Sequence, residues 1–246
     1  MQTFYFTDPG KVRSHNEDSV IILNNENKDF VLAIADGMGG HKAGEVASSI
    51  AIEHITESFE QLEKMGNKED AIDWLRLIVK EINDKIFAYA KKHPESKGLG
   101  TTLVIAIKTE DYILYGNIGD SSGYVIKNNI LHKVTKDHTY VGMLVSNGKI
   151  SEETAKTHPG RNLLTRALGA NDPIEIDIFD IDTSVKGLFL CSDGLTNMLT
   201  NEQIEKVLNS NLAIEEVVVK LIKKANLRGG NDNISIAYLK KESGDQ

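Results

Sequence analysis

Hydrophobic and polar positions follow two different periods along the chain, and the periods change in blocks. Near the start, three short apolar runs are typical of buried strands: 4–6, 19–23 and 30–35. Helical spacing follows at 44–62 and again at 68–92, where apolar residues recur every three to five positions and Pro94 stands just past the end. The first third therefore predicts three strands followed by a pair of helices.

The middle third returns to strand patterns, and the last third adds a second helix pair. Four more apolar or alternating runs predict an antiparallel meander: 101–107, 112–118, 123–126 and 130–134. The segment 136–172 is polar, is interrupted by glycine and proline, and has little apolar periodicity, which is typical of a functional flap or a mobile excursion rather than of core. The last third predicts two strands, a helix pair and a closing strand: 174–181, 187–191, 201–208, 213–225 and 233–239.

The grouping of these elements indicates the fold class. Strands come in hairpin-like groups and helices come in pairs, so the chain does not show a strict βαβ alternation. The pattern favours an α+β fold in which sheets are covered by helix pairs. No composition shift marks a linker, so we expect one catalytic domain over residues 1–241, with the flap inside it and a short polar tail at 242–246.

The composition excludes several classes of function. The 246 residues include 28 Lys and Arg against 36 Asp and Glu, a formal charge of −8, which argues against nucleic acid as a partner. The single cysteine, Cys191, excludes an internal disulfide and a multi-cysteine zinc site. The longest apolar runs, such as 31–35, are too short to cross a bilayer, and the N-terminus lacks a signal segment. We expect a soluble, intracellular globular protein that does not insert into membranes.

Aspartates recur at the ends of the predicted strands, usually next to glycine. Asp36, Asp120 and Asp193 follow apolar runs, whereas Asp18 and Asp232 stand just before them. One Asp-Gly pair alone is most simply a turn or a helix cap. Five such sites in one acidic chain indicate a shared cleft.

Carboxylates that share a cleft repel one another, so such a cluster requires cations. Oxygen ligands without cysteine select hard divalent ions, Mg²⁺ or Mn²⁺, over zinc. Two such ions would balance four aspartates and would lower the pKa of a shared water, which makes hydroxide available near neutral pH. The sequence therefore predicts metal-assisted hydrolysis of a phosphoester.

Seven short motifs stand in an order that resembles one family. They are Arg13-Ser14-His15-Asn16-Glu17-Asp18, Asp36-Gly37-Met38-Gly39-Gly40-His41, Gly98-Leu99-Gly100-Thr101-Thr102, Gly116-Asn117-Ile118-Gly119-Asp120-Ser121, Leu164-Thr165-Arg166-Ala167-Leu168-Gly169, Ser192-Asp193-Gly194-Leu195 and Gly230-Asn231-Asp232-Asn233. The chain thereby resembles the metal-dependent serine/threonine protein phosphatases, the PPM or type 2C family, in its compact bacterial form. The resemblance covers nearly the whole chain and implies a four-layer α-β-β-α sandwich, with two central antiparallel sheets flanked by helix pairs and a flap insertion at about 136–172.

The resemblance also implies which residues hold metal: Asp18, Asp36, Gly37, Asp120, Asp193 and Asp232. Asp36 would bridge two ions in the core site, and the carbonyl oxygen of Gly37 would join one of them. Asp18 and its neighbour Glu17 would act largely through coordinated waters. Asp120 matches the position that holds a third, weaker ion in bacterial members.

The resemblance assigns roles to two further residues. Arg13 would clamp the substrate phosphate, since its planar guanidinium suits two-point contact with phosphate oxygens, and the alternative is a surface ion pair with Glu17 or Asp18. His41 has the chemistry of a general acid for the leaving oxygen, although eukaryotic members carry their histidine at the position of Met38. Donation of a proton, orientation of a water and capping of the next helix all remain open for His41.

The flap holds the most variable positions of the family, so the resemblance implies that substrate selection depends on it. Arg161 and Arg166 are candidates for contact with a phosphopeptide. For Arg166 we favour the alternative of ordinary structural pairing.

The function that follows is a protein serine/threonine phosphatase, in which metal-activated hydroxide hydrolyses phosphoserine and phosphothreonine monoesters and reverses a bacterial Ser/Thr kinase. The expected partners are phosphoprotein substrates and that cognate kinase, and the expected cofactors are two Mn²⁺ or Mg²⁺ ions with a third, weaker one. One alternative is a non-catalytic relative that only binds phosphoproteins, against which the intact set of acidic residues argues. The other is a nucleotide-binding enzyme, but the glycine-rich run 36–42 lacks a Walker A lysine.

Overall fold

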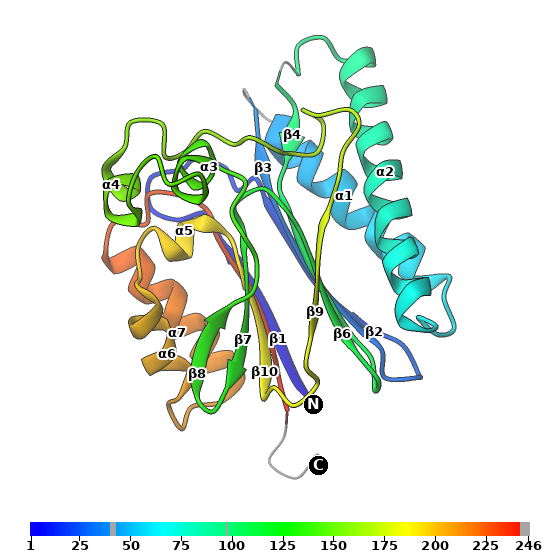
Figure 1. Ribbon diagram of the computed structural model, residues 1–246, viewed down its shortest axis with the longest axis vertical. Coiled ribbons are helices and arrows are strands. Elements are labelled where there is room, and N and C mark those ends of the chain that lie inside the picture. Colours follow the sequence, from blue (N-terminus) through cyan, green and yellow to red (C-terminus); the bar gives the residue numbers. More distant parts are fainter. Residues whose placement is uncertain (40–42, 97, 242–246) are drawn as a thin grey trace.

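The computed structural model describes residues 1–39, 43–96 and 98–241, and two antiparallel sheets form its centre (Figure 1). The first sheet has the strand order β1 (Gln2–Asp8), β11 (Ile234–Lys240), β10 (Gly187–Cys191), β7 (Ser122–Lys127) and β8 (Ile130–Lys133). The second has the order β2 (Asp18–Asn24), β3 (Phe30–Met38), β5 (Leu103–Lys108), β6 (Ile113–Ile118) and β9 (Asp177–Ile181), and the short β4 (Gly100–Thr101) pairs with the end of β3.

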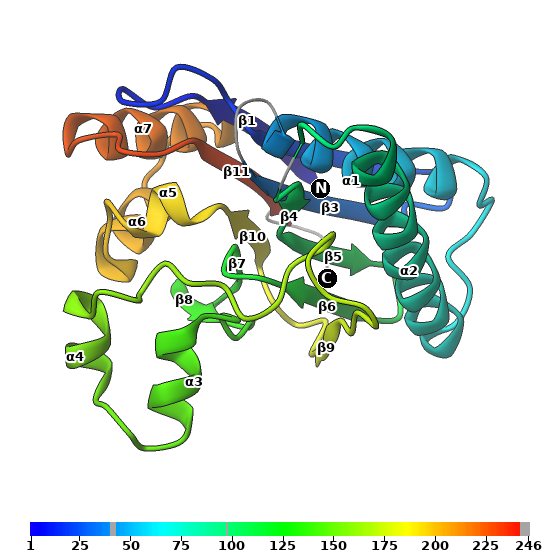
Figure 2. The same cartoon turned by 90° about the horizontal axis from the view of Figure 1, so that it is seen from above.

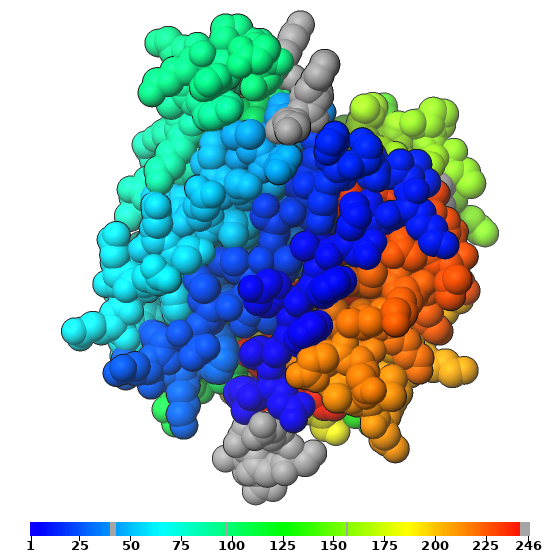
Figure 3. Space-filling view, turned by 180° about the vertical axis from the view of Figure 1, so that it is seen from behind, coloured from blue at the N-terminus to red at the C-terminus, as the bar shows by residue number. Residues whose placement is uncertain are grey.

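Helices cover the outer face of each sheet, as Figures 1 and 2 show. The second sheet carries α1 (Ala43–Glu60) and α2 (Lys68–Lys92), whereas the first carries α5 (Asp193–Thr196), α6 (Asn201–Leu208) and α7 (Ile214–Leu227). Seen from behind in Figure 3, the N-terminal segment in dark blue lies between α7 in orange and the lighter blue elements of the second sheet. The expected α-β-β-α sandwich is confirmed.

Three hydrophobic cores separate the four layers. Successive residues of β3 alternate between two of them, since Val31 and Ala33 face α1 and α2, whereas Leu32 and Ile34 face the first sheet. On the first sheet, Phe189 faces the helices α5 to α7 in the third core. Because the central strands are buried on both faces, they appear in the sequence as continuous apolar runs.

The sequence prediction differs from the structure at several boundaries. The predicted strand 174–181 begins only at Asp177 in the structure. Ile174 and Ile176 are apolar because they pack against the core under α1 and α2, but their backbone lies outside the strand. The predicted strand 101–107 is divided into β4 and β5. The four-residue α5 was not predicted, since it is too short to show a helical period.

The flap contains two short helices that the weak periodicity of 136–172 did not predict. Helix α3 (Tyr140–Ser146) begins after Thr139, whose hydroxyl accepts a hydrogen bond from the backbone N–H of Gly142. Helix α4 (Glu152–Thr157) begins after Ser151, which caps it in the same way. Side-chain caps, and not apolar periodicity, therefore mark where both helices begin. Figure 2 shows the two helices standing beside the first sheet.

Two further expectations concern the chain as a whole. Within the described residues, none of the helices combines the length and the apolar character that a membrane crossing needs. The polar tail at 242–246 lies outside the described residues. The single catalytic domain stays a prediction.

Candidate active site

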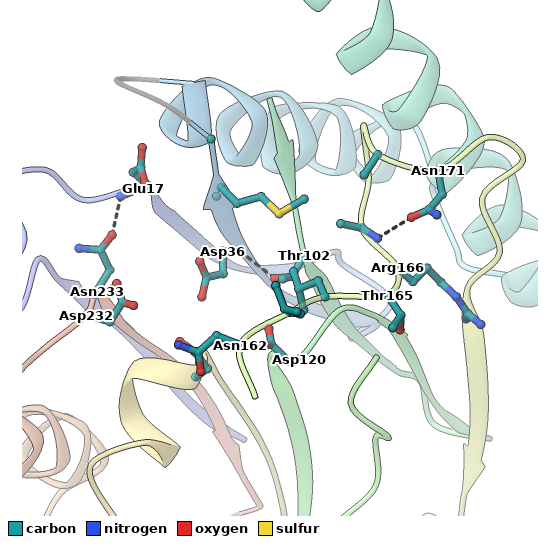
Figure 4. A pocket seen from close by; sticks show the side chains of 18 of the residues that line it. Glu17, Asp36, Thr102, Asp120, Asn162, Thr165, Arg166, Asn171, Asp232 and Asn233 are labelled. Atoms are coloured by element: carbon teal, nitrogen blue, oxygen red, sulfur yellow. Dashed lines mark hydrogen bonds between the residues drawn. The ribbon is translucent and has the colours of Figure 1, made fainter. Parts of the chain in front are cut away.

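The predicted aspartates come together where strands of both sheets end. Asp18 and Asp36 face each other in the register of β2 and β3 in the second sheet. Asp193 is the first residue of α5, two residues after the end of β10, and Asp232 stands two residues before β11; both strands belong to the first sheet. Asp120 lies in the turn between β6 and β7, which links the two sheets. Figure 4 shows Asp36, Asp120 and Asp232 around one open space.

A cleft of about 480 Å³ occupies this end of the molecule. Its walls include most of the predicted site residues: Arg13, Asp36, Gly37, Asp120, Asp193 and Asp232. The flap supplies another wall through residues 162–167. Asp18 is not among the described residues that line the cleft: it is only 7% exposed and stands opposite Asp36 in the register of β2 and β3.

Burial and mutual repulsion raise the pKa of four of these carboxyl groups. Burial raises the pKa of Asp18 and of Asp120 to about 7 and that of Asp193 to about 6, and neighbouring aspartates add to each rise. The pKa of Asp36 is raised well above its ordinary value, first by burial and then by Asp18. Each shift means that the folded protein opposes negative charge here unless positive charge is supplied.

Asp18 has one satisfied and one unsatisfied carboxylate oxygen. Its Oδ2 accepts a hydrogen bond of 2.8 Å from the hydroxyl of Ser192, which in turn accepts one of 2.9 Å from the backbone N–H of Ser235. Its Oδ1 is buried and has no hydrogen-bond partner. An orphaned buried carboxylate oxygen is costly, and a cation or a water bound to a cation would satisfy it.

The close approach of β3 to the start of α1 requires glycine at two positions. A Cβ atom at Gly37 would stand 2.1 Å from the carbonyl oxygen of Gly44, and one at Gly44 would stand 2.8 Å from Cδ of Glu17. The backbone of Asp36 is held from the other side, where its N–H donates to the hydroxyl of Thr102 at 3.1 Å (Figure 4). The glycines thus allow Glu17, Asp36 and the helix start to lie together.

Arg13 lies at the rim of the cleft and forms an ion pair with a predicted metal ligand. Its Nη2 is 2.8 Å from Oδ2 of Asp232, and the Arg13 side chain is half-exposed. The ion-pair alternative is therefore correct in kind, but the partner is Asp232 and not Glu17 or Asp18. The expected contact with substrate phosphate stays a prediction.

The predictions on three other basic side chains have different outcomes. Arg166 donates to Oδ1 of Asp177 at 2.5 Å and to the backbone carbonyl of Glu175 at 3.3 Å, so the expected structural pairing is confirmed. Arg161 is exposed and is absent from the described residues that line the cleft. His41, the predicted general acid, lies outside the described residues.

Sequence reasoning missed the residues that join the site segments. The side chain of Asn233 accepts from the backbone N–H of Glu17 at 2.8 Å and donates to the carbonyls of Pro9 and His15 at 2.9 Å each. Ser192 connects the two sheets through Asp18. Both residues stand next to predicted ligands in the motifs, so their position was visible, but their partners lie far away in sequence.

The donor set fits hard divalent cations. The acidic side chains gathered here are all oxygen donors, burial and then mutual repulsion raise their pKa values, and Oδ1 of Asp18 lacks a partner. Within the described ranges, no three Asp, Glu, His or Cys side chains already stand in an arrangement that would hold one ion. The described carboxylates are therefore gathered in one place, but they are not arranged as a complete set of ligands around one ion.

Comparisons with known proteins agree with this architecture. The family model described as protein phosphatase 2C matches residues 11–227. The serine/threonine phosphatase stp of Listeria monocytogenes is 38% identical over 243 residues, which are 98% of this chain and 96% of that protein. The serine/threonine phosphatase of S. agalactiae has a TM-score of 0.93 at 32% identity, and the alignment covers 98% of this chain and 99% of that one. Stp1 from Staphylococcus aureus has a TM-score of 0.92 at 35% identity, covering 98% and 95%.

The two-sheet sandwich with carboxylates gathered where its strands end, together with these matches, defines a metal-dependent phosphoprotein phosphatase. Within that class, the chain belongs to the protein phosphatase 2C family.

Proposed function

We propose that this protein hydrolyses phosphoserine and phosphothreonine monoesters on other proteins, with Mn²⁺ or Mg²⁺ as cofactor. The names of its Listeria and Staphylococcus relatives support the choice of serine and threonine. The observation that carries the proposal is the convergence of Asp36, Asp193 and Asp232 from both sheets on one open cleft. A phosphoryl group can reach this cleft, whereas a buried structural cluster would exclude it.

The metal-holding residues follow from the donor chemistry. We infer that Asp36, the carbonyl of Gly37, Asp193 and Asp232 hold two ions, and that Asp120 contributes to a third, weaker site. Asp18 and Glu17 would contact the ions through water, which agrees with the burial of Asp18 outside the described cleft lining. Bound divalent ions would supply positive charge for the phosphate and lower the pKa of a water molecule to near neutrality.

The remaining residues of the cleft either contact the substrate or hold the acidic segments in place. In this proposal the guanidinium of Arg13 contacts phosphate oxygens from the rim, since it is half-exposed and already directed at the cleft by Asp232. Thr102 and Asn233 keep the backbone of Asp36 and Glu17 in place through the hydrogen bonds described above. The role of His41 in protonating the leaving oxygen stays a prediction.

The cellular setting belongs to the same proposal. Reversal of a bacterial Ser/Thr kinase in the cytoplasm is consistent with an acidic chain whose described helices are unsuited to crossing a membrane. We propose phosphoproteins and that cognate kinase as its partners, and a monomeric single domain as the active form.

The test is phosphate release from a phosphoserine or phosphothreonine peptide by the purified full chain. We expect release with Mn²⁺ or Mg²⁺ and none in excess chelator. Asp36→Asn or Asp193→Asn should lower kcat by about a hundredfold or more, because each removes a ligand charge. Asp180→Asn is the matched control, since Asp180 is exposed on β9 and pairs with Lys68 away from the cleft. Full activity in chelator, or a covalent phosphoenzyme, would contradict the proposal.

A further inference from the structure

Three large apolar side chains of the flap are exposed to solvent. Tyr140 and Met143 on α3 are 38% and 44% exposed, and Leu163 in the segment after α4 is 60% exposed. Exposed apolar side chains are common when they stand singly. These three belong to one small region of the flap, which we call the apolar flap patch.

Contacts join Tyr140 to Leu163, and helical spacing places Met143 beside Tyr140. The backbone N–H of Tyr140 donates to the carbonyl of Leu163 at 2.7 Å. Both side chains also meet above Gly160, where a Cβ atom would be 3.2 Å from Cδ1 of Tyr140 and 3.3 Å from Cδ1 of Leu163. Met143 lies three residues after Tyr140, which places it on the same face of α3, one turn further on.

The patch is continuous with the catalytic cleft. Leu163 lines the cleft together with Asp36 and Asp120. Among the described residues of that lining, Leu163 is also the large apolar side chain that is exposed to solvent. Its neighbour Asn162, labelled in Figure 4, lines the same cleft. A substrate chain extends from its phosphorylated residue in both directions, and the flap residues 162–167 form one of the walls that it can pass.

We propose that the apolar flap patch binds an apolar side chain of the substrate protein, within three residues of the phosphorylated serine or threonine. An extended chain advances roughly 3.3 Å per residue, so a residue two or three positions from the phosphorylated one lies roughly 7–10 Å from it. That length is comparable with the width of a cleft of about 480 Å³, in which Leu163 is part of the wall. This inference rests on the proposed function and specifies its substrate class. The phosphatase is therefore selective for phosphorylation sites flanked by an apolar residue.

A second copy of this chain is the competing occupant of the patch. A stable dimer commonly buries at least about 1,000 Å² in total. The three partly exposed side chains of the patch offer only a fraction of that area. This smaller area is enough to cover one leucine side chain of a substrate. Continuity with the cleft and the small size of the patch both favour a peptide.

The experiment measures kcat/KM on a set of short phosphoserine peptides in Mn²⁺. In one peptide all flanking residues are serine and glycine, and in the others a single leucine stands at one position from −3 to +3. We expect at least one leucine position to raise kcat/KM by about tenfold over the serine peptide, the usual value of one buried aliphatic group. In Leu163→Ser this leucine-to-serine ratio should fall to about one, and in Leu163→Met it should be largely kept.

Each enzyme is its own reference, because the ratio cancels any general loss of activity. Met143→Ser should lower the ratio as well, and Leu77→Ser, which changes a 54%-exposed leucine on α2, should leave it at the wild-type value. Equal rates on all peptides, or a wild-type ratio in Leu163→Ser, would overturn the patch but leave the proposed function intact. Hydrolysis of none of the peptides would refute the proposed function and the patch with it. A dimer that Leu163→Ser converts to a monomer would assign the patch to a second copy instead.

Discussion

At the scale of single residues, the site depends on polar side chains that hold the acidic ones. Ser192 connects Ser235 of β11 with Asp18 of β2, which is 174 positions away in sequence, and so ties the first sheet to the second. It fixes which oxygen of Asp18 is satisfied inside the protein and which remains available. The hydroxyl therefore orients a carboxylate without lining the cleft.

Replacement of this hydroxyl tests its contribution. Ser192→Ala leaves Oδ2 of Asp18 and the N–H of Ser235 buried without partners, so we expect the free energy of unfolding to fall by about 1–3 kcal/mol. Urea unfolding measures this change. Ser146→Ala is the control, since the Ser146 hydroxyl bonds to Met143 on the exposed flap, and it should cost less than about 0.5 kcal/mol. An equal loss in the free energy of unfolding for the two variants would show that the Ser192 hydrogen bonds stabilise the fold no more than an exposed one does.

Arg13 is the second residue whose role can be separated by substitution. We expect Arg13→Ala to raise KM for a phosphopeptide several-fold, with a smaller effect on the affinity for Mn²⁺, because it removes a phosphate contact but no metal ligand. Arg13→Lys should recover part of the loss through its charge. Steady-state kinetics and isothermal titration with Mn²⁺ measure the two effects. An unchanged KM in Arg13→Ala would place the phosphate clamp elsewhere.

At the scale of elements, the decisive feature is the crossing of β3 and the start of α1. Glycine stands at both sides of the contact, at Gly37 and Gly44, and allows the backbones to approach. An Asp-Gly pair taken alone predicts a turn or a helix cap, and the resemblance made the Gly37 carbonyl a metal ligand, but the local pattern cannot show which distant backbone comes near. The structure places Gly37 inside β3, in register with Thr101 of β4.

A methyl group at this crossing tests the close approach. Gly37→Ala puts a Cβ atom 2.1 Å from the carbonyl oxygen of Gly44, so the strand and the helix must separate, and we expect a loss of about 2 kcal/mol or more in stability. Gly148→Ala is the matched control, because Gly148 has φ +65° but an open environment. It should cost only the backbone strain of about 1–2 kcal/mol. Thermal unfolding of both variants measures the difference, and a Gly37→Ala protein as stable as the wild type would contradict the crossing.

At the scale of the whole molecule, the acidic cluster makes stability depend on pH and on metal. A carboxyl group with a raised pKa in the folded state binds its proton more tightly there than in the unfolded chain, where the pKa is about 4. As the pH rises from about 4 to about 7, the unfolded chain loses these protons first, so the free energy of unfolding falls across this range. The groups concerned are Asp18, Asp120 and Asp193, whose pKa values are raised to about 6 or 7.

Metal ions should reverse this loss where the carboxylates are ionised. We expect Mn²⁺ to raise the Tm of the chelator-treated protein more at pH 7.5 than at pH 5.5, because protons compete for the ligands at the lower pH. Scanning calorimetry at both pH values measures the shifts. In Asp18→Asn the metal-free protein should be stabilised at pH 7.5, since a buried charge is removed. A metal-dependent shift of the same size at both pH values would contradict this account.

The sequence by itself determined the layers and the identity of the acidic residues. Period-two and period-3.6 patterns predicted most strands and the long helices within a few residues, and the aspartates at strand ends predicted a cleft that the structure contains. Local patterns carry this information because each residue of a strand or helix must face a core or the solvent.

Only the tertiary structure decided which side chains meet. The register places Asp18 opposite Asp36, and the packing of the sheets brings Ser192 to Asp18. The fold of the flap pairs Arg166 with Asp177 and leaves Leu163 exposed at the cleft. A periodic pattern shows that a side chain points inward or outward, but the partner it meets depends on segments far away in the chain, which no local pattern specifies.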